Sequence, residues 1–230
     1  MIPAKTPNPH RSHGSPKIRT LRLESDVVYS PPKQLTFEQF LEEYGGNPDY
    51  ELVNGEVIPM DPTGPHEIVI ANLLMKLVMA IAQTGKPWRP LQNCPVKPFL
   101  DRDTARRPDL AIVDAAALSK DPSWQKQAAL LNPKPIKLAI EVVSTNWQTD
   151  YIQKVEEYAI FGIAEYWIVD FRGLGGIEYI GTPKQPTFIV ATLHDNQYHQ
   201  TQYRLGQAIE SPLFPELKLR LDDITEPPID

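Results

Sequence analysis

Two acidic side chains stand in segments that otherwise have the composition of buried β-strands. Glu141 interrupts the apolar run 138–143, and Asp109 follows a proline at the start of the run 110–113. A buried carboxylate must be paired, bound to a metal ion or protonated, because leaving it charged and unpaired costs several kcal/mol. If the two strands are neighbours in a sheet, the carboxylates can converge, as a hard cation such as Mg²⁺ requires.

Lys154 supplies a third group, on the helix expected directly after the strand of Glu141. It lies four residues after Asp150 and four before Tyr158, so these side chains share one helical face. An ammonium group near a metal ion can orient the attacking water and offset negative charge that develops on a phosphate. Together the two acids and the lysine favour metal-dependent hydrolysis of phosphodiester bonds.

Ordinary structural roles explain the same residues. Glu141 can form a salt bridge with Lys137 or with an arginine. Lys154 can form an i,i+4 ion pair with Asp150 on a solvated helix face. Asp109 by itself is typical of a turn or of the start of a strand, as most Pro-Asp pairs are. The functional prediction therefore depends on the combination and not on any one residue.

The elements that must position these groups follow from apolar spacing and turn residues. Asn54-Gly55 between two apolar runs predicts a tight hairpin, and Asp150 and Gln153 have the spacing of a capping box. In chain order we first expect a helix over 36–45, a hairpin of 50–53 and 56–60, and a helix over 66–83. Strands follow over 95–100, 108–113 and 136–143, with a part-helical segment before the last of them. A helix over 150–161 and strands over 166–169, 177–180, 187–193 and 198–204 complete the order.

These elements predict one α/β domain of the α+β type over residues 36–226, with a mixed central sheet flanked by helices. Its core is expected over 66–170, and a β-rich extension over 171–226 continues the sheet as a meander. Residues 1–35 have few spaced apolar positions and carry six basic side chains against two acidic ones. This composition predicts a flexible basic arm.

Charge and composition limit the possible partners. The net charge is −6, and outside the first 35 residues 17 basic side chains face 27 acidic ones, so any contact with phosphates must be local. A bound cation would offset the carboxylates where a phosphate sits. The single cysteine, Cys94, has no disulfide partner and is expected to be a packing residue. The sequence has no apolar run of membrane-spanning length and no secretory signal, so we expect a cytoplasmic protein that does not bind membranes.

Several short motifs, which include the two acids and the lysine, follow one another along the chain. They are Tyr50-Glu51-Leu52-Val53-Asn54-Gly55-Glu56-Val57, His66, Arg107-Pro108-Asp109-Leu110, Ile140-Glu141-Val142-Val143-Ser144, Asp150, Lys154, Tyr158, Gly162, Glu165-Tyr166-Trp167-Ile168-Val169-Asp170 and Ser211-Pro212-Leu213-Phe214-Pro215-Glu216-Leu217. In this order and spacing they resemble the Uma-two family of the PD-(D/E)xK, or restriction-endonuclease-like, superfamily. The resemblance covers about residues 35–226.

The resemblance implies a restriction-endonuclease-like fold and a metal-dependent endonuclease, with DNA as the expected nucleic acid. It implies that Asp109 and Glu141 bind Mg²⁺ or Mn²⁺ together with the backbone carbonyl of Val142. It also implies products that carry a 5′-phosphate and a 3′-hydroxyl. The lysine of the superfamily, expected two residues after Glu141, is replaced by Val143. Lys154 on the next helix would take its place and complete the catalytic set.

Further positions near the metal also match the family. Glu51 and His66 fill auxiliary positions, and Tyr158 and Gln148 are weaker candidates for positioning the substrate. Glu51 can equally be a hairpin residue that faces solvent, and His66 can equally be a helix cap or a surface residue, although a neutral imidazole can bind metal or phosphate. A homodimer is the default expectation for an enzyme that cuts two strands.

Two other classes of function fit parts of the pattern. A catalytically silent binding module with the same fold would keep its binding after Asp109→Asn and Glu141→Gln. A glycosidase also uses two carboxylates, but it needs no lysine at the site. Its hydrolysis would survive excess EDTA, whereas that of a metal-dependent nuclease would not.

Overall fold

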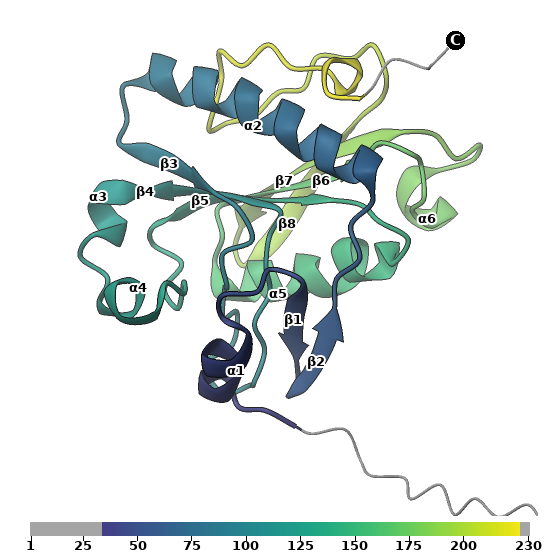
Figure 1. The fold of residues 1–230 in the computed structure, drawn as a ribbon. Coiled ribbons are helices and arrows are strands. Elements are labelled where there is room, and N and C mark those ends of the chain that lie inside the picture. Colours follow the sequence, from purple (N-terminus) through teal and green to yellow (C-terminus); the bar gives the residue numbers. More distant parts are fainter. Residues whose placement is uncertain (1–33, 226–230) are drawn as a thin grey trace, which may run out of the picture. The chain divides into compact units, whose positions relative to one another are not determined.

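A six-stranded sheet forms the centre of the described chain, which covers residues 34–225 of a computed structural model. Residues 1–33 of the predicted basic arm lie outside the described residues. β5 and β6 are parallel and the other neighbouring strands are antiparallel, which confirms the predicted mixed sheet (Figure 1). The strand order is β3 (Trp88–Leu91), β4 (Leu110–Asp114), β5 (Ile136–Val142), β6 (Glu165–Asp170), β7 (Thr187–His194) and β8 (Gln197–Tyr203).

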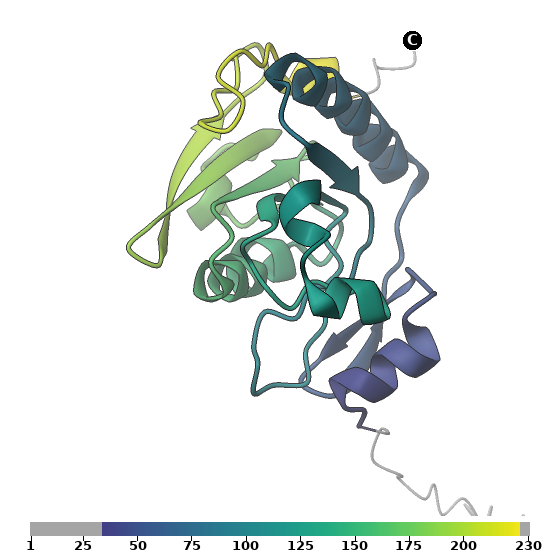
Figure 2. The same cartoon turned by 90° about the vertical axis from the view of Figure 1, so that its left-hand side faces the viewer.

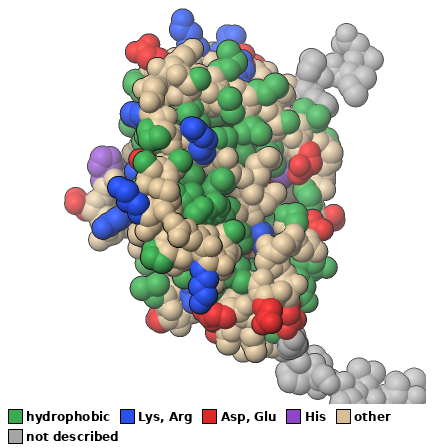
Figure 3. Space-filling view, turned by 60° about the vertical axis from the view of Figure 1, so that its left-hand side comes forward, with side chains coloured by type: hydrophobic (Ala, Val, Ile, Leu, Met, Phe, Trp, Pro, Cys, Tyr) green, Lys and Arg blue, Asp and Glu red, His purple; other side chains and the backbone are tan. Residues whose placement is uncertain are grey.

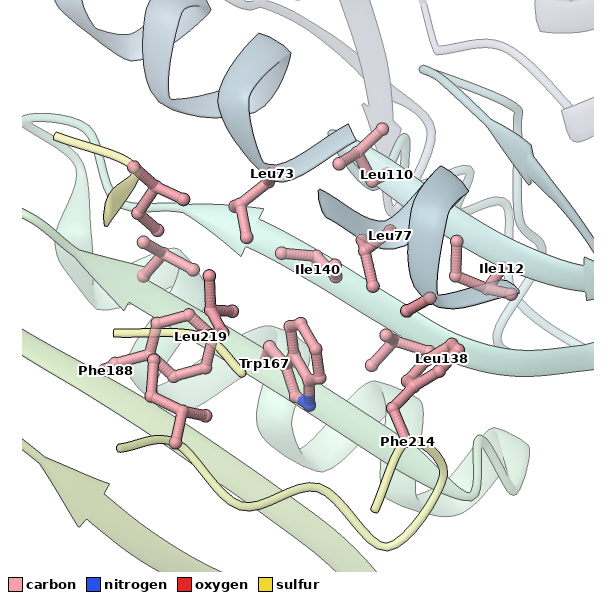
Figure 4. Close-up of a cluster of buried hydrophobic side chains, with 14 of the residues drawn as sticks. Leu73, Leu77, Leu110, Ile112, Leu138, Ile140, Trp167, Phe188, Phe214 and Leu219 are labelled. Carbon is pink, nitrogen blue, oxygen red and sulfur yellow. The ribbon is translucent and has the colours of Figure 1, made fainter. Parts of the chain in front are cut away.

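One long helix covers one face of this sheet. α2 (Gly64–Thr84) begins with a proline in its first turn and ends at Gly85, whose φ of 67° is readily adopted only by glycine. Its side chains Leu73 and Leu77 are fully buried against the sheet residues Leu138, Ile140 and Trp167, as Figure 4 shows. The length and composition of α2 would also suit a membrane crossing, a property that it shares with core helices.

The opposite face of the sheet packs against α5 (Lys154–Phe161), so that the sheet lies between α2 and α5 (Figures 1 and 2). Side chains alternate between the two faces along each strand. In β5, Leu138 and Ile140 face α2, whereas Ala139, and Val143 directly after the strand, join the cluster under α5. Glu141 has the parity of this second group, which sets its carboxylate on the α5 side.

A small unit formed by a helix and a hairpin precedes α2. α1 (Phe37–Tyr44) starts at the capping box of Thr36 and Gln39, and β1 (Tyr50–Val53) pairs with β2 (Glu56–Pro59) about the predicted turn. The Arg107 guanidinium fixes this unit to the core, since it donates to backbone carbonyls on both sides of the junction. Its acceptors are the carbonyls of Tyr44, Gly45, Tyr50 and Asn93.

The prediction of a strand over 95–100 is wrong. Only Val96 forms isolated bridges there, to Arg106 and Leu130, because Pro95 and Pro98 lack the N–H groups that a ladder needs. The sheet gains β3 at residues 88–91 instead, as a short edge strand that tolerates a proline. The predicted part-helical segment before β5 is confirmed as α3 (Ala115–Leu118) and α4 (Pro122–Gln127).

Two further predictions need correction. Residues 177–180 form a helical turn, α6 (Ile177–Ile180), and not a strand, because the N–H groups of Ile180 and Gly181 donate to the carbonyls of Gly176 and Ile177 four residues earlier. The helix predicted over 150–161 begins as a π-helical turn, Thr149–Gln153, before α5. Asp150 makes no capping hydrogen bond there and is buried instead. A 3₁₀ turn, Leu221–Asp223, lies near the end of the described chain.

Candidate active site

The side chains of Asp109, Glu141 and Lys154 line one cavity of about 600 Å³. Asp109 directly precedes β4, Glu141 lies near the end of β5, and Lys154 starts α5. Glu51 from β1 and His66 from the first turn of α2 line the same cavity. Five of the six predicted catalytic and auxiliary side chains therefore line one cavity, and they come from five separate segments of the chain.

Glu141 is held on both of its carboxylate oxygens. Its Oε2 lies 2.9 Å from the Lys154 ammonium, and its Oε1 accepts a hydrogen bond of 2.8 Å from the Tyr158 hydroxyl. Tyr158 is fully buried behind Glu141 and does not line the cavity. The ion pair with Lys137 that the sequence allowed does not form; the Lys137 ammonium donates instead to the carbonyl of Lys134.

The Lys154 ammonium lies among three carboxylates. Besides Glu141, it is 3.4 Å from Glu51 Oε1 and 3.4 Å from Asp150 Oδ1, and only 4% of the residue is exposed. Burial would lower the pKa of Lys154, but the three acids outweigh burial and raise it. The charged form of Lys154 is therefore favoured in this arrangement, and the side chain is not a solvated helix residue.

Glu51 faces the site and not solvent. Its carboxylate accepts from the backbone N–H of Arg107 at 2.8 Å and from the Arg106 guanidinium at 3.0 Å. Burial alone would raise the pKa of Glu51, but Lys154 and Arg106 outweigh burial and lower it. The solvent-facing interpretation of this hairpin residue is wrong.

Arg106 links the hairpin to α5. Its guanidinium donates two hydrogen bonds, of 2.6 and 2.7 Å, to the Glu157 carboxylate, and another of 3.2 Å to Gln153. A guanidinium with two parallel bonds to one carboxylate is held strongly in orientation as well as position. Because the same group also binds Glu51, Arg106 fixes β1 relative to the helix that carries Lys154.

Asp109 and His66 meet at the backbone of Val142. Asp109 Oδ2 accepts a hydrogen bond of 2.7 Å from the Val142 N–H, and His66 Nε2 lies 2.9 Å from the Val142 carbonyl. His66 Nε2 is also 3.4 Å from Asp109 Oδ2, and the residue is buried. Burial would lower the pKa of His66, but its contacts with Asp109 outweigh burial and raise it. His66 is thus part of the site and not a surface cap.

The acids of the site repel one another. Burial raises the pKa of Glu141, and Asp109, Asp150 and Glu51 raise it further against the opposing effect of Lys154. Burial likewise raises the pKa of Asp150 to about 6. Both shifts mean that Lys154 does not fully offset burial and the repulsion among the acids, which a bound cation would offset further.

The donor set suits a hard divalent cation. Asp109, Glu141 and the Val142 carbonyl offer oxygen ligands, which Mg²⁺ and Mn²⁺ prefer. Within the described residues, however, no three His, Cys, Asp or Glu side chains already have the arrangement of a metal site. The residues fit a metal ion in their chemistry, and their side chains would have to move to bind it.

Three charged residues of the site were not identified as functional from the sequence. Asp150 was predicted to cap a helix, and Arg106 and Glu157 carried no motif. The π-helical turn that turns Asp150 inward also has no sequence signature, although such turns occur often at functional sites. The one available signal was Arg106 itself, an arginine three residues before Asp109.

The rim of the cavity is acidic. Eight acidic side chains line the cavity against two basic ones, Arg106 and Lys154, which are both buried. On the face that Figure 3 shows, Lys and Arg side chains are dispersed and do not form one continuous basic tract. The eight acidic residues are Asp49, Glu51, Glu56, Asp61, Glu67, Asp109, Glu141 and Asp150.

Gln148 also lines the cavity, where it could contact a substrate.

Comparisons with known proteins agree with this architecture. A family model described as "Uma2: Putative restriction endonuclease" matches residues 37–222. No match was found among curated proteins. Among solved structures, the chain is similar to a "putative nuclease belonging to DUF820 from Anabaena variabilis ATCC 29413", with a TM-score of 0.59 and 18% identity over 83% of this chain and 97% of that chain. At this identity the structural similarity shows a shared fold alone, which confirms the predicted fold class.

Proposed function

Because the chain belongs to the Uma2 family of restriction-endonuclease-like proteins, we propose that it is a metal-dependent endonuclease that hydrolyses phosphodiester bonds in DNA. The observation that carries the proposal is the convergence of Asp109, Glu141 and Lys154 on one cavity. Two acids from neighbouring strands and one amine from the following helix are the groups that this hydrolysis needs.

Asp109, Glu141 and the carbonyl of Val142 would hold Mg²⁺ or Mn²⁺. The ion would polarise the scissile phosphate and lower the pKa of a bound water. The Val142 N–H orients the Asp109 carboxylate, and the Tyr158 hydroxyl orients the Glu141 carboxylate, so the protein fixes both ligands from behind. Such supporting hydrogen bonds set the direction in which a ligand presents its oxygen atoms.

Lys154 is the group that would place the attacking water and offset charge on the phosphate. It is the cation of the site that lines the cavity and carries a flexible four-carbon chain. His66 lies beside Asp109, where its imidazole could donate to a phosphate oxygen. Glu51 would act as an auxiliary acid that keeps Lys154 charged and directed at the site.

DNA is the proposed partner although the cavity rim is acidic. Phosphate binding needs positive charge, and the first 35 residues carry six basic side chains against two acidic ones. That segment can supply the electrostatic contact with the DNA backbone, while the metal ion neutralises the phosphate that is cut. By the family resemblance, the products would carry a 5′-phosphate and a 3′-hydroxyl.

Cleavage of supercoiled plasmid tests the proposal. We expect wild-type protein to nick or linearise the plasmid with Mg²⁺ or Mn²⁺ and to be inactive in excess EDTA. Asp109→Asn keeps the shape of the side chain but removes a ligand charge, so nicking should slow by at least about 100-fold. Asp101→Asn in an exposed loop is the matched control and should cleave like wild type.

The outcomes separate the alternatives. Nicking by Asp109→Asn at the wild-type rate, or cleavage that persists in EDTA, would contradict the proposal. DNA binding without cleavage by wild-type protein in either metal would identify a catalytically silent binding module instead. Light scattering in solution would test the expected homodimer, which cutting both strands favours.

A further inference from the structure

The Lys154 ammonium has the surroundings of a bound cation. Its carboxylate neighbours come from three different segments: Glu51 from β1, Glu141 from β5 and Asp150 from the π-helical turn. Each of these residues is at least nine-tenths buried, and so is Lys154. An amine at the centre of buried acids from separate segments is positioned by the fold and not by one helix alone.

We propose that Lys154 competes with the metal ion for Glu141: its ammonium occupies the position beside Glu141 Oε2 that a divalent cation bound to Asp109 and Glu141 would need. The inference rests on the proposed metal-dependent function of the same site. It adds that cation binding and the Lys154–Glu141 ion pair exclude each other, so the ion enters as the lysine leaves Glu141.

The distances around Lys154 fit an ammonium group and not a metal ion. The carboxylate oxygens lie 2.9 to 3.4 Å from the Lys154 nitrogen, whereas Mg²⁺ binds oxygen at about 2.1 Å. The acids are therefore spaced around an ammonium group, which agrees with the lack of a ready three-acid metal arrangement among the described residues. Two positive charges beside Glu141 would also repel each other strongly in a buried site.

The displaced lysine has somewhere to go. Lys154 lines the cavity of about 600 Å³, so its long side chain can turn from Glu141 toward the open volume where a phosphate would lie. Asp150, one turn earlier on the same face, can keep the ammonium in the site during this movement. Metal binding would thus release the amine toward the substrate, which makes the charged lysine available only when the metal ion is present.

Metal affinity tests the inference without any measurement of cleavage. Binding of Mn²⁺ to wild-type protein and to Lys154→Met is compared by isothermal titration calorimetry at slightly alkaline pH. Because Lys154→Met removes the competing charge but keeps the length of the side chain, we expect it to bind Mn²⁺ at least about tenfold more tightly. Lys120→Met, an exposed lysine, is the control and should bind like wild type.

A second pair guards against misfolding of Lys154→Met, which leaves three buried acids without their ammonium. Asp150→Asn lowers this repulsion, so Asp150→Asn is compared with Asp150→Asn/Lys154→Met. The double variant should again bind Mn²⁺ about tenfold more tightly. Equal or weaker binding after removal of the lysine in both pairs would overturn the inference and leave the nuclease proposal intact. Failure of Mn²⁺ to bind wild type and every variant would instead refute the metal-dependent function.

Discussion

The two faces of the central sheet use the same strands for opposite purposes. Toward α2, Ile140 and its neighbours form a cluster of hydrophobic side chains. Toward α5, the next residue in the chain is Glu141, which lies among three other carboxylates, one ammonium and one tyrosine hydroxyl. Two adjacent residues of β5 therefore have different roles: Ile140 stabilises the fold, and Glu141 can take part in chemistry.

The two faces differ in what they contribute to the free energy of folding. A fully buried aliphatic side chain such as Ile140 stabilises the folded state by roughly 1.5–3 kcal/mol. The charged cluster must overcome the cost of removing ions from water, and its acids repel one another. The raised pKa of Glu141 and of Asp150 shows that this cost is not fully offset. Burial of apolar side chains on the hydrophobic face thus offsets the free-energy cost of the charged cluster on the polar face.

The largest expected effect comes from a substitution that changes the polar face alone. Glu141→Gln keeps the shape of the side chain and can still accept from Tyr158, but it removes a charge that would bind the metal ion. We expect plasmid nicking to fall at least about 100-fold. Denaturant unfolding should show that the protein remains folded, since the fold disfavours a charge at this position. Loss of the folded protein would mean that Glu141 is structural.

Its counterpart on the hydrophobic face should do the reverse. Ile140→Ala leaves a cavity beneath Leu73 and Leu77, so we expect the free energy of unfolding to fall by about 2–5 kcal/mol. Nicking per folded molecule should stay within about twofold of wild type. Ile152→Ala, at a residue that is 45% exposed, is the matched control with little change. A loss of activity larger than the loss of folded protein would show that the two faces are coupled.

A smaller effect tests how the polar face is supported. Tyr158→Phe removes the hydrogen bond to Glu141 Oε1 and leaves a buried carboxylate oxygen without its donor. We expect a loss of about 1–2 kcal/mol in the free energy of unfolding, together with slower nicking. Tyr198→Phe loses a similar bond to the Ile163 carbonyl, away from the acids, and should lower stability alone. Equal nicking by both variants would contradict a role for Tyr158.

The smallest effect concerns an acid outside the catalytic group. Glu165 is buried at the start of β6 and accepts from Trp167, Ser211 and the Leu213 N–H, all neutral donors. Burial raises the pKa of Glu165 above its ordinary value of 4.5, so the folded state binds its proton more tightly than the unfolded state. The free energy of unfolding should therefore fall as pH rises from 4.5 through the raised pKa.

Glu165→Gln should remove this part of the pH dependence while its amide oxygen still accepts from Trp167 and Ser211; only the longer hydrogen bond from the Leu213 N–H is lost. Urea unfolding of wild type and variant across the acidic to neutral range measures the difference in slope. An unchanged slope would show that the carboxyl of Glu165 does not titrate differently in the folded and unfolded states.

Local elements were predictable where one signal outweighed the others. Asn54-Gly55 fixed the hairpin, and Gly85 and Gly162 fixed the ends of α2 and α5. Prediction failed where a short apolar run had two possible structures, as at residues 177–180, or where prolines interrupted a run of strand-forming residues, as at 95–100. In such segments tertiary contacts decide the conformation, because the local preferences nearly cancel.

The sequence by itself determined which groups could act: two acids in apolar strands and a lysine on the next helix. It also determined that the lysine would share a face with Asp150 and Tyr158, since that follows from helical spacing. Only the tertiary structure decided that Lys154 lies among acids from three segments and that Arg106 ties β1 to α5. Burial and the distances between charges depend on contacts between residues far apart in the chain, and the local sequence does not specify these contacts.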